Sequence, residues 1–361
     1  MTREALAPGA VIGILGGGQL GRMIAQAAAE LGFFVHIYCP EQDCPAAQVS
    51  AYFTCADYTD QQALQKFAAD VDAITYEFEN VPQETVRFLS AQKPVAPSAD
   101  ALGVAQDRWI EKSFIQGQGI EVAPFYDITC LNDLEHALGA LGGEGILKTR
   151  RFGYDGKGQW RISSGSDLTR VYAELKNQPA ILEGLVKFER EVSVIIARDH
   201  LGNTECYDPT ENIHENHILR FSRVPGNIAL NLQQEARHIA NRLATALDYV
   251  GILAIELFVS GDKLIVNEMA PRVHNSGHWT MDAAATSQFS QHMRAVAGWP
   301  LGQTTRHSNV EMENLLGNEI EKWFSFAQES NCHIHLYGKN EAKPGRKMGH
   351  INRTSALTIN G

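Results

Sequence analysis

The sequence contains no hydrophobic run close to the roughly 20 residues that a helix needs to cross a bilayer, and the apolar stretch at 10–15 is too short for a signal peptide. Its six cysteines include no Cys-x-x-Cys pair and are spaced too irregularly for a disulfide framework, so we expect reduced thiols. Positive charge is also scarce. The 31 Lys plus Arg face 42 Asp plus Glu, and the formal net charge of −11 disfavours nucleic acid and anionic membranes as partners. These absences predict a cytoplasmic protein in which any bound phosphate is held by a local site.

What is present is an ordinary globular composition, with 44% hydrophobic and 20% charged residues in a chain of 361 residues, long enough for two or three domains. Strand-like and helix-like patterns alternate from the start, at 11–15, 20–31 and 33–38, as in a parallel α/β sheet. Later strands are shorter and punctuated by glycine. We therefore predict an α/β protein with a Rossmann-like N-terminal domain, a small α+β subdomain with a glycine-rich loop, and a larger α+β subdomain, at 1–106, 107–186 and 187–361.

Gly16, Gly18 and Gly21 form a GxGxxG pattern between the first strand and the first helix, where free N–H groups and the helix dipole suit an anion. A nicotinamide site would also want an acidic residue at the end of the second strand. That strand instead ends in Tyr-Cys-Pro at 38–40. The pattern thus favours a phosphate-bearing substrate at this turn over the main alternative, a nicotinamide-dependent oxidoreductase.

A second glycine-rich segment, 152–158, follows the apolar strand that leads to Lys148. A Lys at a strand end and a glycine-rich hairpin can together close on phosphate oxygens. The alternative is an ordinary hairpin with surface charges. We favour the phosphate clamp because five basic residues gather here in an acidic chain: Lys148, Arg150, Arg151, Lys157 and Arg161.

Glu256 lies inside an apolar strand, where an unpaired carboxylate would be costly to bury. The turn at 261–262 lets the next strand fold back. A three-residue loop would place Glu256 opposite Glu268, and a two-residue loop would place it opposite Asn267. Converging oxygen ligands of this kind suit Mg²⁺. The alternative is a salt bridge to Arg272 or another cation.

His274 and His278 have the spacing of a helical zinc pair, but Asn-Ser-Gly lies between them, so we do not expect zinc. They belong instead to a dense polar segment just after the proposed metal strand. A second basic cluster at 343–347 is compatible with an anion site or a solvated turn. The sequence offers no GxSxG and no Cys beside a His motif. We therefore expect nucleotide-dependent chemistry without a covalent intermediate on the protein.

Five segments together carry a family resemblance: 16–22, 75–80, 153–159, 267–280 and 345–350. They resemble the ATP-grasp enzymes and, among these, the ATP-dependent carboxylases of purine biosynthesis. The stretch 267–280 is the most discriminating, because other ATP-grasp enzymes share its Asn-Glu and Pro-Arg elements but not its Asn-Ser-Gly-His-Trp. The resemblance covers nearly the whole chain and implies an ATP-grasp fold.

The resemblance also implies a set of site residues. ATP would be bound by Arg108, Lys148, Phe152, Gly153, Tyr154, Asp155, Gly156, Lys157, Gly158, Glu183, Gly184, Leu185, Val186, Glu191, His214, Asn267 and Glu268. Two Mg²⁺ ions would be bound by Glu256 and Glu268. The ribonucleotide and bicarbonate would be bound by Gln19, Leu20, Glu77, Arg272, His274, Asn275, Ser276, Arg346 and Lys347. Catalytic roles would fall to Tyr154, Asp155, Arg272, His274 and Lys347, with Asp155 and His274 as candidates for moving the proton.

The implied reaction is a carbon–nitrogen ligation. Bicarbonate attacks the γ-phosphate of ATP to give carboxyphosphate, and the exocyclic amine of aminoimidazole ribonucleotide is then carboxylated. The family also implies a homodimer. Two further alternatives are an ATP-grasp ligase for a different acid and amine, and a nucleotide sensor without activity. Glu256, Glu268, Lys148 and Asp155 are all present, which argues against the sensor.

Overall fold

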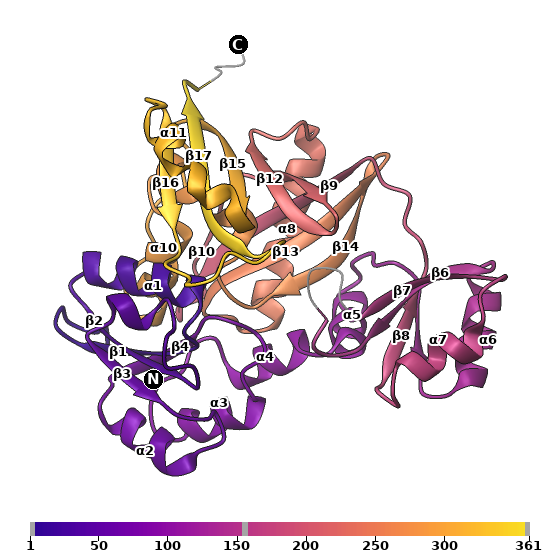
Figure 1. The fold of residues 1–361 in the computed structure, drawn as a ribbon, viewed down its shortest axis with the longest axis horizontal. Helices are drawn as coiled ribbons and strands as arrows, with labels where there is room; N and C mark the ends of the chain where they lie inside the picture. Colours follow the sequence, from indigo (N-terminus) through magenta and orange to yellow (C-terminus); the bar gives the residue numbers. More distant parts are fainter. Residues whose placement is uncertain (1–3, 154–157, 358–361) are drawn as a thin grey trace.

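The computed structural model describes residues 4–153 and 158–357, and the chain forms three parts around a common junction (Figure 1). The N-terminal part is a parallel sheet in the order β3-β2-β1-β4. Strands β1, β2 and β4 are almost entirely buried, as expected when helices cover a parallel sheet, whereas β3 at the edge is partly exposed. The elements are β1 (Val11–Leu15), α1 (Gln19–Glu30), β2 (Phe34–Cys39), η1 (Ala47–Val49), β3 (Tyr52–Cys55), α2 (Gln61–Ala69), β4 (Ala73–Tyr76), α3 (Gln83–Ser90) and α4 (Ala99–Ala105).

The small subdomain is an antiparallel sheet in the order β5-β8-β6-β7, with α6 and α7 packed on it. It stands apart in Figure 1 and is reached through α5. Buried leucines at 134, 138, 147 and 182 form its own core. The elements are α5 (Arg108–Gly117), β5 (Phe125–Ile128), α6 (Leu131–Ala140), β6 (Glu144–Thr149), β7 (Gln159–Ser163), α7 (Leu168–Glu174) and β8 (Ala180–Glu183).

The large subdomain contains a nine-stranded sheet in the order β14-β13-β9-β11-β12-β15-β17-β16, with β10 paired to β9. Helix α8 packs on one side of β9 and β13, and α10 contacts the same strands and α1. The strands are β9 (Arg190–Arg198), β10 (Thr204–Cys206), β11 (Thr210–Glu215), β12 (Ile218–Val224), β13 (Gly251–Ser260), β14 (Lys263–Ala270), β15 (Asn309–Leu316), β16 (Cys332–Leu336) and β17 (Lys347–Ser355). The helices are α8 (Leu230–Ala246), η2 (Asn275–Gly277), α9 (Thr280–Ala283), α10 (Gln288–Val296), η3 (Gly317–Lys322) and α11 (Trp323–Ala327).

The α/β architecture predicted from the sequence is confirmed, while the domain boundaries at 106 and 186 remain predictions. The sequence pattern at 281–297 reads as one helix, and that interpretation is wrong. The segment is divided into α9 and α10, because Ala284 bridges to Arg306 in extended conformation and Ser287 caps the second helix. The side chain of Ser287 accepts the N–H of Ser290, which starts a new helix rather than continuing the old one.

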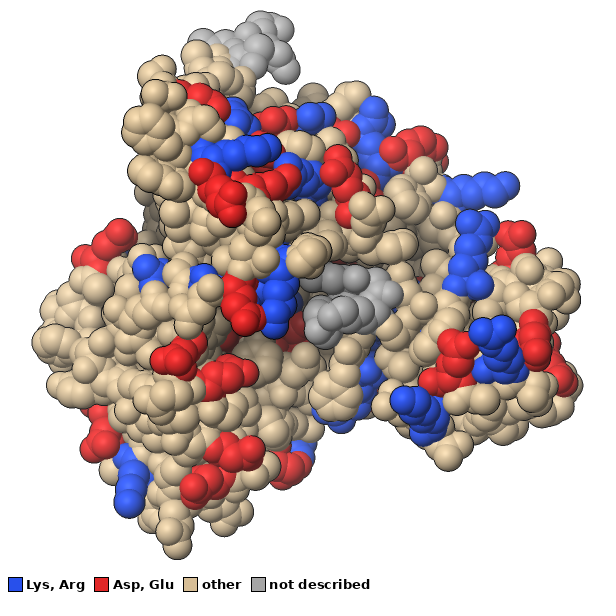
Figure 2. Space-filling view, viewed as in Figure 1, with Lys and Arg blue, Asp and Glu red and all other residues tan. Residues whose placement is uncertain are grey.

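Acidic and basic side chains are interspersed over the face seen in Figure 2. In the part of the chain that the structure describes, no helix is long and apolar enough to cross a membrane.

Candidate active site

Glu256 of β13 and Glu268 of β14 lie directly opposite each other. The hairpin turn has two residues, 261–262, which by simple alternation would have paired Glu256 with Asn267. A β-bulge leaves Asn267 outside the ladder and advances the register by one residue. The turn therefore has two residues, as in one predicted alternative, while Glu256 pairs with Glu268, as in the other.

Lys112 of α5 contacts the bulged residue, Asn267. Its ammonium donates to the main-chain carbonyl of Asn267 at 3.0 Å and lies 3.3 Å from a carboxylate oxygen of Glu183. Lys148 donates to the same Glu183 oxygen at 2.9 Å. Lys112 is fully buried, so both contacts compensate a charge that would otherwise be costly. Lys112 was not recognised from the sequence, where its only signal is its place in a polar helix.

Lys148 and Arg108 are cations next to Glu183 and Glu268. Burial lowers the pKa of Lys148, while the neighbouring Glu183 carboxylate favours its charged form. Arg108 begins α5, capped by Asp107, and donates to Glu268 at 2.8 Å. Burial alone would raise the pKa of Glu268, but the Arg108 guanidinium holds it below its usual range.

Glu256 is less well compensated than Glu268. Burial raises its pKa, and the like charge of Glu268 raises it further. This carboxylate therefore lacks sufficient positive charge in the protein alone, which is the condition that a bound cation relieves. No cluster of three or more His, Cys, Asp and Glu suited to a metal occurs in residues 4–153 and 158–357. Two carboxylates are nevertheless a normal protein contribution for Mg²⁺, which shares phosphate oxygens and keeps waters.

His274 lies beside Glu256, with its Nε2 atom 3.3 Å from the carboxylate and its Nδ1 atom 2.9 Å from the hydroxyl of Ser276. Burial and the positive charges of Arg272 and Lys347 lower the pKa of His274 to about 3, so the imidazole is neutral near pH 7. Zinc was not expected at His274 and His278. The two rings take separate partners, because Nδ1 of His278 accepts from Gln288.

The predicted alternative of a Glu256–Arg272 salt bridge is wrong, since Arg272 pairs with Glu79 instead. Glu79 was not recognised from the sequence.

Asn275 is buried, and both of its amide atoms lack a hydrogen-bond partner among the described residues. Such a group is expected to gain partners when a polar ligand binds.

The N–H groups of the glycine turn after β1 bind a carboxylate of the protein itself, that of Glu77. The N–H of Gly18 and the N–H of Gly21, the latter at 2.6 Å, donate to the two carboxylate oxygens of Glu77. Gly16 has a φ of +111°, and a Cβ there would collide with the Glu77 side chain. The phosphate expected on these N–H groups is thus replaced by Glu77, which is buried and places its carboxylate beside Gln19 and Leu20.

The residues predicted to bind the nucleotide at 183–186 lie at the end of β8 and in the segment that leads to β9. Gly184, Leu185 and Val186 follow β8, and the N–H of Gly184 donates to the carbonyl of Pro124 at 2.8 Å. The Oε1 atom of Glu183 is buried and has no partner among the described residues. Further along, His214 lies 3.1 Å from Glu191, and although burial lowers the pKa of His214, this carboxylate raises it above its ordinary value.

The remaining predicted residues divide into four groups. Lys347, at the start of β17, acts electrostatically on Glu256 and His274, so it belongs to the cluster. Arg346 lies on an exposed turn, where its guanidinium donates to the carbonyl of Glu341 at 3.0 Å. Phe152, Gly153 and Gly158 flank the glycine-rich loop, with the Phe152 ring 66% exposed. Tyr154, Asp155, Gly156 and Lys157 lie outside the described residues.

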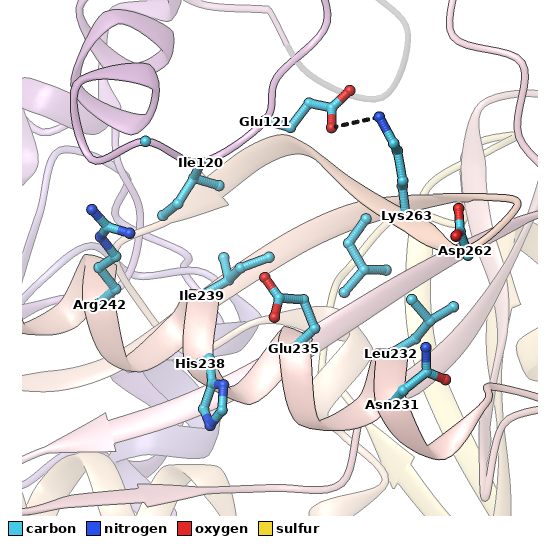
Figure 3. Close-up of a pocket in the computed structure, with 12 residues that line it drawn as sticks. Ile120, Glu121, Asn231, Leu232, Glu235, His238, Ile239, Arg242, Asp262 and Lys263 are labelled. Carbon is cyan, nitrogen blue, oxygen red and sulfur yellow. Dashed lines mark ion pairs between the residues drawn. The ribbon is translucent and has the colours of Figure 1, made fainter.

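A separate surface hollow of about 500 Å³ lies between α8 and the β13–β14 hairpin (Figure 3). Glu121 and Lys263 point toward each other at its rim, 3.6 Å apart. None of the predicted site residues lines it. The chemistry is therefore assigned to the junction of the three parts and not to this hollow.

Comparison with known proteins agrees with this geometry. Three family models match: the ribonucleotide synthetase preATP-grasp domain at residues 10–106, the ATP-grasp domain at 113–289, and the phosphoribosylaminoimidazole carboxylase C-terminal domain at 311–357. The N5-carboxyaminoimidazole ribonucleotide synthase of Brucella melitensis is 52% identical over 99% of this chain and 100% of its own length.

Two solved structures are also similar. The Staphylococcus aureus N5-carboxyaminoimidazole synthetase complexed with ADP is 35% identical, with a TM-score of 0.93, covering 98% of this chain and 95% of that one. The Aspergillus clavatus synthase in complex with ADP and 5-aminoimidazole ribonucleotide is 28% identical, with a TM-score of 0.90, covering 97% and 94%.

The chain is thus an ATP-grasp ligase that binds ATP. Within that class it belongs to the N5-carboxyaminoimidazole ribonucleotide synthases, which convert aminoimidazole ribonucleotide to its N5-carboxy derivative at the expense of ATP in purine biosynthesis.

Proposed function

We propose that the chain carries out this conversion through carboxyphosphate. A bicarbonate oxygen attacks the γ-phosphorus and ADP leaves; carboxyphosphate then loses phosphate to give CO₂, and the amine of the ribonucleotide attacks the carbon and gives up a proton. The observation that carries this proposal is the convergence of two cations, Lys148 and Arg108, with two facing carboxylates, Glu256 and Glu268. Catalysis of phosphoryl transfer rests on such positioning and charge stabilisation.

Glu256 and Glu268 are the residues that would hold the two Mg²⁺ ions that the family resemblance implies. The metal would neutralise charge on the phosphate oxygens and help to orient them. The raised pKa of Glu256 supports this assignment, because its cause is uncompensated negative charge.

We assign the binding of the ribonucleotide and bicarbonate to the residues around Glu77 and His274. Glu77 and the buried, unpartnered amide of Asn275 are positioned to bind polar groups of the ribonucleotide. Arg272 and Lys347 supply positive charge near His274, which suits bicarbonate and carboxyphosphate. Neutral His274 can accept a proton only with difficulty, so within this pair of candidates we assign the proton transfer to Asp155, which lies outside the described residues.

The relatives support the choice of ligands. The S. aureus protein is described with ADP, and the A. clavatus protein with ADP and 5-aminoimidazole ribonucleotide. We extend both ligands to this chain, together with the homodimer and the cytoplasmic location expected from the sequence.

The carboxyphosphate route is tested by supplying ¹⁸O-labelled bicarbonate with MgATP and aminoimidazole ribonucleotide. The proposal predicts that label appears in the released phosphate, because the attacking oxygen stays on phosphorus when the intermediate breaks down. Phosphate free of label, formed at the same rate as the carboxylated product, would exclude this route.

A further inference from the structure

A row of polar side chains crosses the buried face of the large sheet from the metal carboxylates inward. Glu268, Glu256 and Ser193 are consecutive partners on β14, β13 and β9. Asn212 of β11 and Ser222 of β12 are also direct partners, and Ser193 bonds to Asn212 across the diagonal. Partners across a sheet point to the same face. The row continues the established site by three residues that neither sequence motif nor family resemblance assigns.

The hydrogen bonds along this row have a defined direction. The hydroxyl of Ser222 lies 2.8 Å from Oδ1 of Asn212, which can only accept, and Nδ2 of Asn212 donates to the hydroxyl of Ser193 at 2.9 Å. Ser193 then donates to the hydroxyl of Ser276 at 2.7 Å. All of these groups are buried, three of them completely, so each hydroxyl hydrogen needs an acceptor inside the protein.

The acceptor available to Ser276 is Nδ1 of His274, at 2.9 Å. The backbone N–H of Ser276 also points at this atom, at 3.4 Å. Two donors directed at Nδ1 leave no room for a proton on it. The ring proton of neutral His274 must then sit on Nε2, which faces the Glu256 carboxylate at 3.3 Å.

We propose that Ser193, acting through Ser276, is a positioning residue that fixes His274 as the Nε2–H tautomer and aims that N–H at the Glu256 carboxylate. An N–H donor of this kind orients a metal-binding carboxylate, and loss of such outer contacts weakens metal binding by about 10- to 100-fold. The tautomer of His274 and its hydrogen bond to Glu256 do not depend on which reaction the protein catalyses. The catalytic consequence of this hydrogen bond rests on the magnesium role given above to Glu256.

The test begins with ¹⁵N NMR of histidine-labelled, metal-free protein, with His274 assigned from a His274→Gln spectrum. In the wild type, Nε2 is expected to be protonated and Nδ1 bare. Ser193→Ala should move the Nδ1 resonance toward the protonated position, while Thr85→Val, which removes another buried hydroxyl, one that donates to the carbonyl of Tyr58 in the N-terminal part, should not. A wild-type protein with its proton on Nδ1 would refute the relay, even if Ser193→Ala failed to fold.

The second readout is the magnesium requirement. Ser193 lies two hydrogen bonds beyond His274, the group that contacts the Glu256 carboxylate. For Ser193→Ala we therefore expect the half-saturating Mg²⁺ concentration to rise about three- to tenfold, with turnover restored by excess metal. An unchanged requirement would remove Ser193 from this role. If the tautomer is as predicted but no enzyme form responds to the ribonucleotide, the relay stands and the proposed function fails.

Discussion

The ammonium of Lys112 lies 3.0 Å from the main-chain carbonyl of Asn267, the residue that bulges out between the two facing strands. A bulged residue has a carbonyl outside the ladder, and a buried carbonyl must find a donor elsewhere. Lys112 supplies that donor and also contacts Glu183 of the small subdomain. One buried charge thus links α5 to the bulge of β14 and, through Glu183, to Lys148.

Replacing this charge should affect both stability and metal use. Lys112→Met removes the donor from Asn267 and leaves Glu183 with Lys148 alone, and breaking a buried ion pair costs about 3–5 kcal/mol. We expect a lower free energy of unfolding by urea and a raised Mg²⁺ requirement. Lys66→Met, at an exposed position of α2, is the matched control and should change neither. Wild-type stability in Lys112→Met would contradict the linking role.

Glu256 predicts a pH dependence of metal binding. Its pKa is raised to about 7 by burial and by Glu268, so below that pH the carboxyl is increasingly protonated and a cation must displace the proton. Affinity for Mg²⁺ should fall as the pH drops, by up to about tenfold per unit, and level off above the raised pKa. Calorimetric titration with Mg²⁺ in the presence of ADP measures this. Constant affinity between about pH 5.5 and 8 would show that Glu256 is not a ligand.

Glu268→Gln tests whether the site depends on the negative charge of this carboxylate. The amide keeps the shape but loses the charge that both Arg108 and a cation need. We expect turnover to fall by about 100-fold or more, as for removal of a preorganised charge contact, with a large rise in the Mg²⁺ requirement. Steady-state kinetics over a Mg²⁺ series gives both values. A variant with wild-type turnover at ordinary Mg²⁺ would place the metal elsewhere.

Asn275 predicts a selective defect in ribonucleotide binding. Its buried amide has no partner among the described residues, so the ligand is expected to provide one. Asn275→Ala should raise the KM for aminoimidazole ribonucleotide by about tenfold, the value of one or two hydrogen bonds, and leave the KM for ATP nearly unchanged. Equal changes in both constants would indicate a general disturbance of the site.

The phosphate clamp around Lys148 stays a prediction. The sequence did predict the α/β class and, as one of two registers, Glu256 opposite Glu268, because both follow from local pattern. It did not predict the bulge at Asn267. That feature is set by Lys112, which is 155 residues away in the chain and reaches the strand only after folding. The binding of Glu77 to the glycine turn is similar, since an anion at a helix start is predictable but its source 59 residues away is not.

The central claim is that this site couples ATP cleavage to carboxylation of one acceptor. ADP release by the purified protein with MgATP and bicarbonate, measured with and without aminoimidazole ribonucleotide, tests it most directly. We expect slow release without the ribonucleotide and a large stimulation with it, matched mole for mole by carboxylated product. Release that is indifferent to the ribonucleotide, from protein that binds ATP, would rule out this coupling.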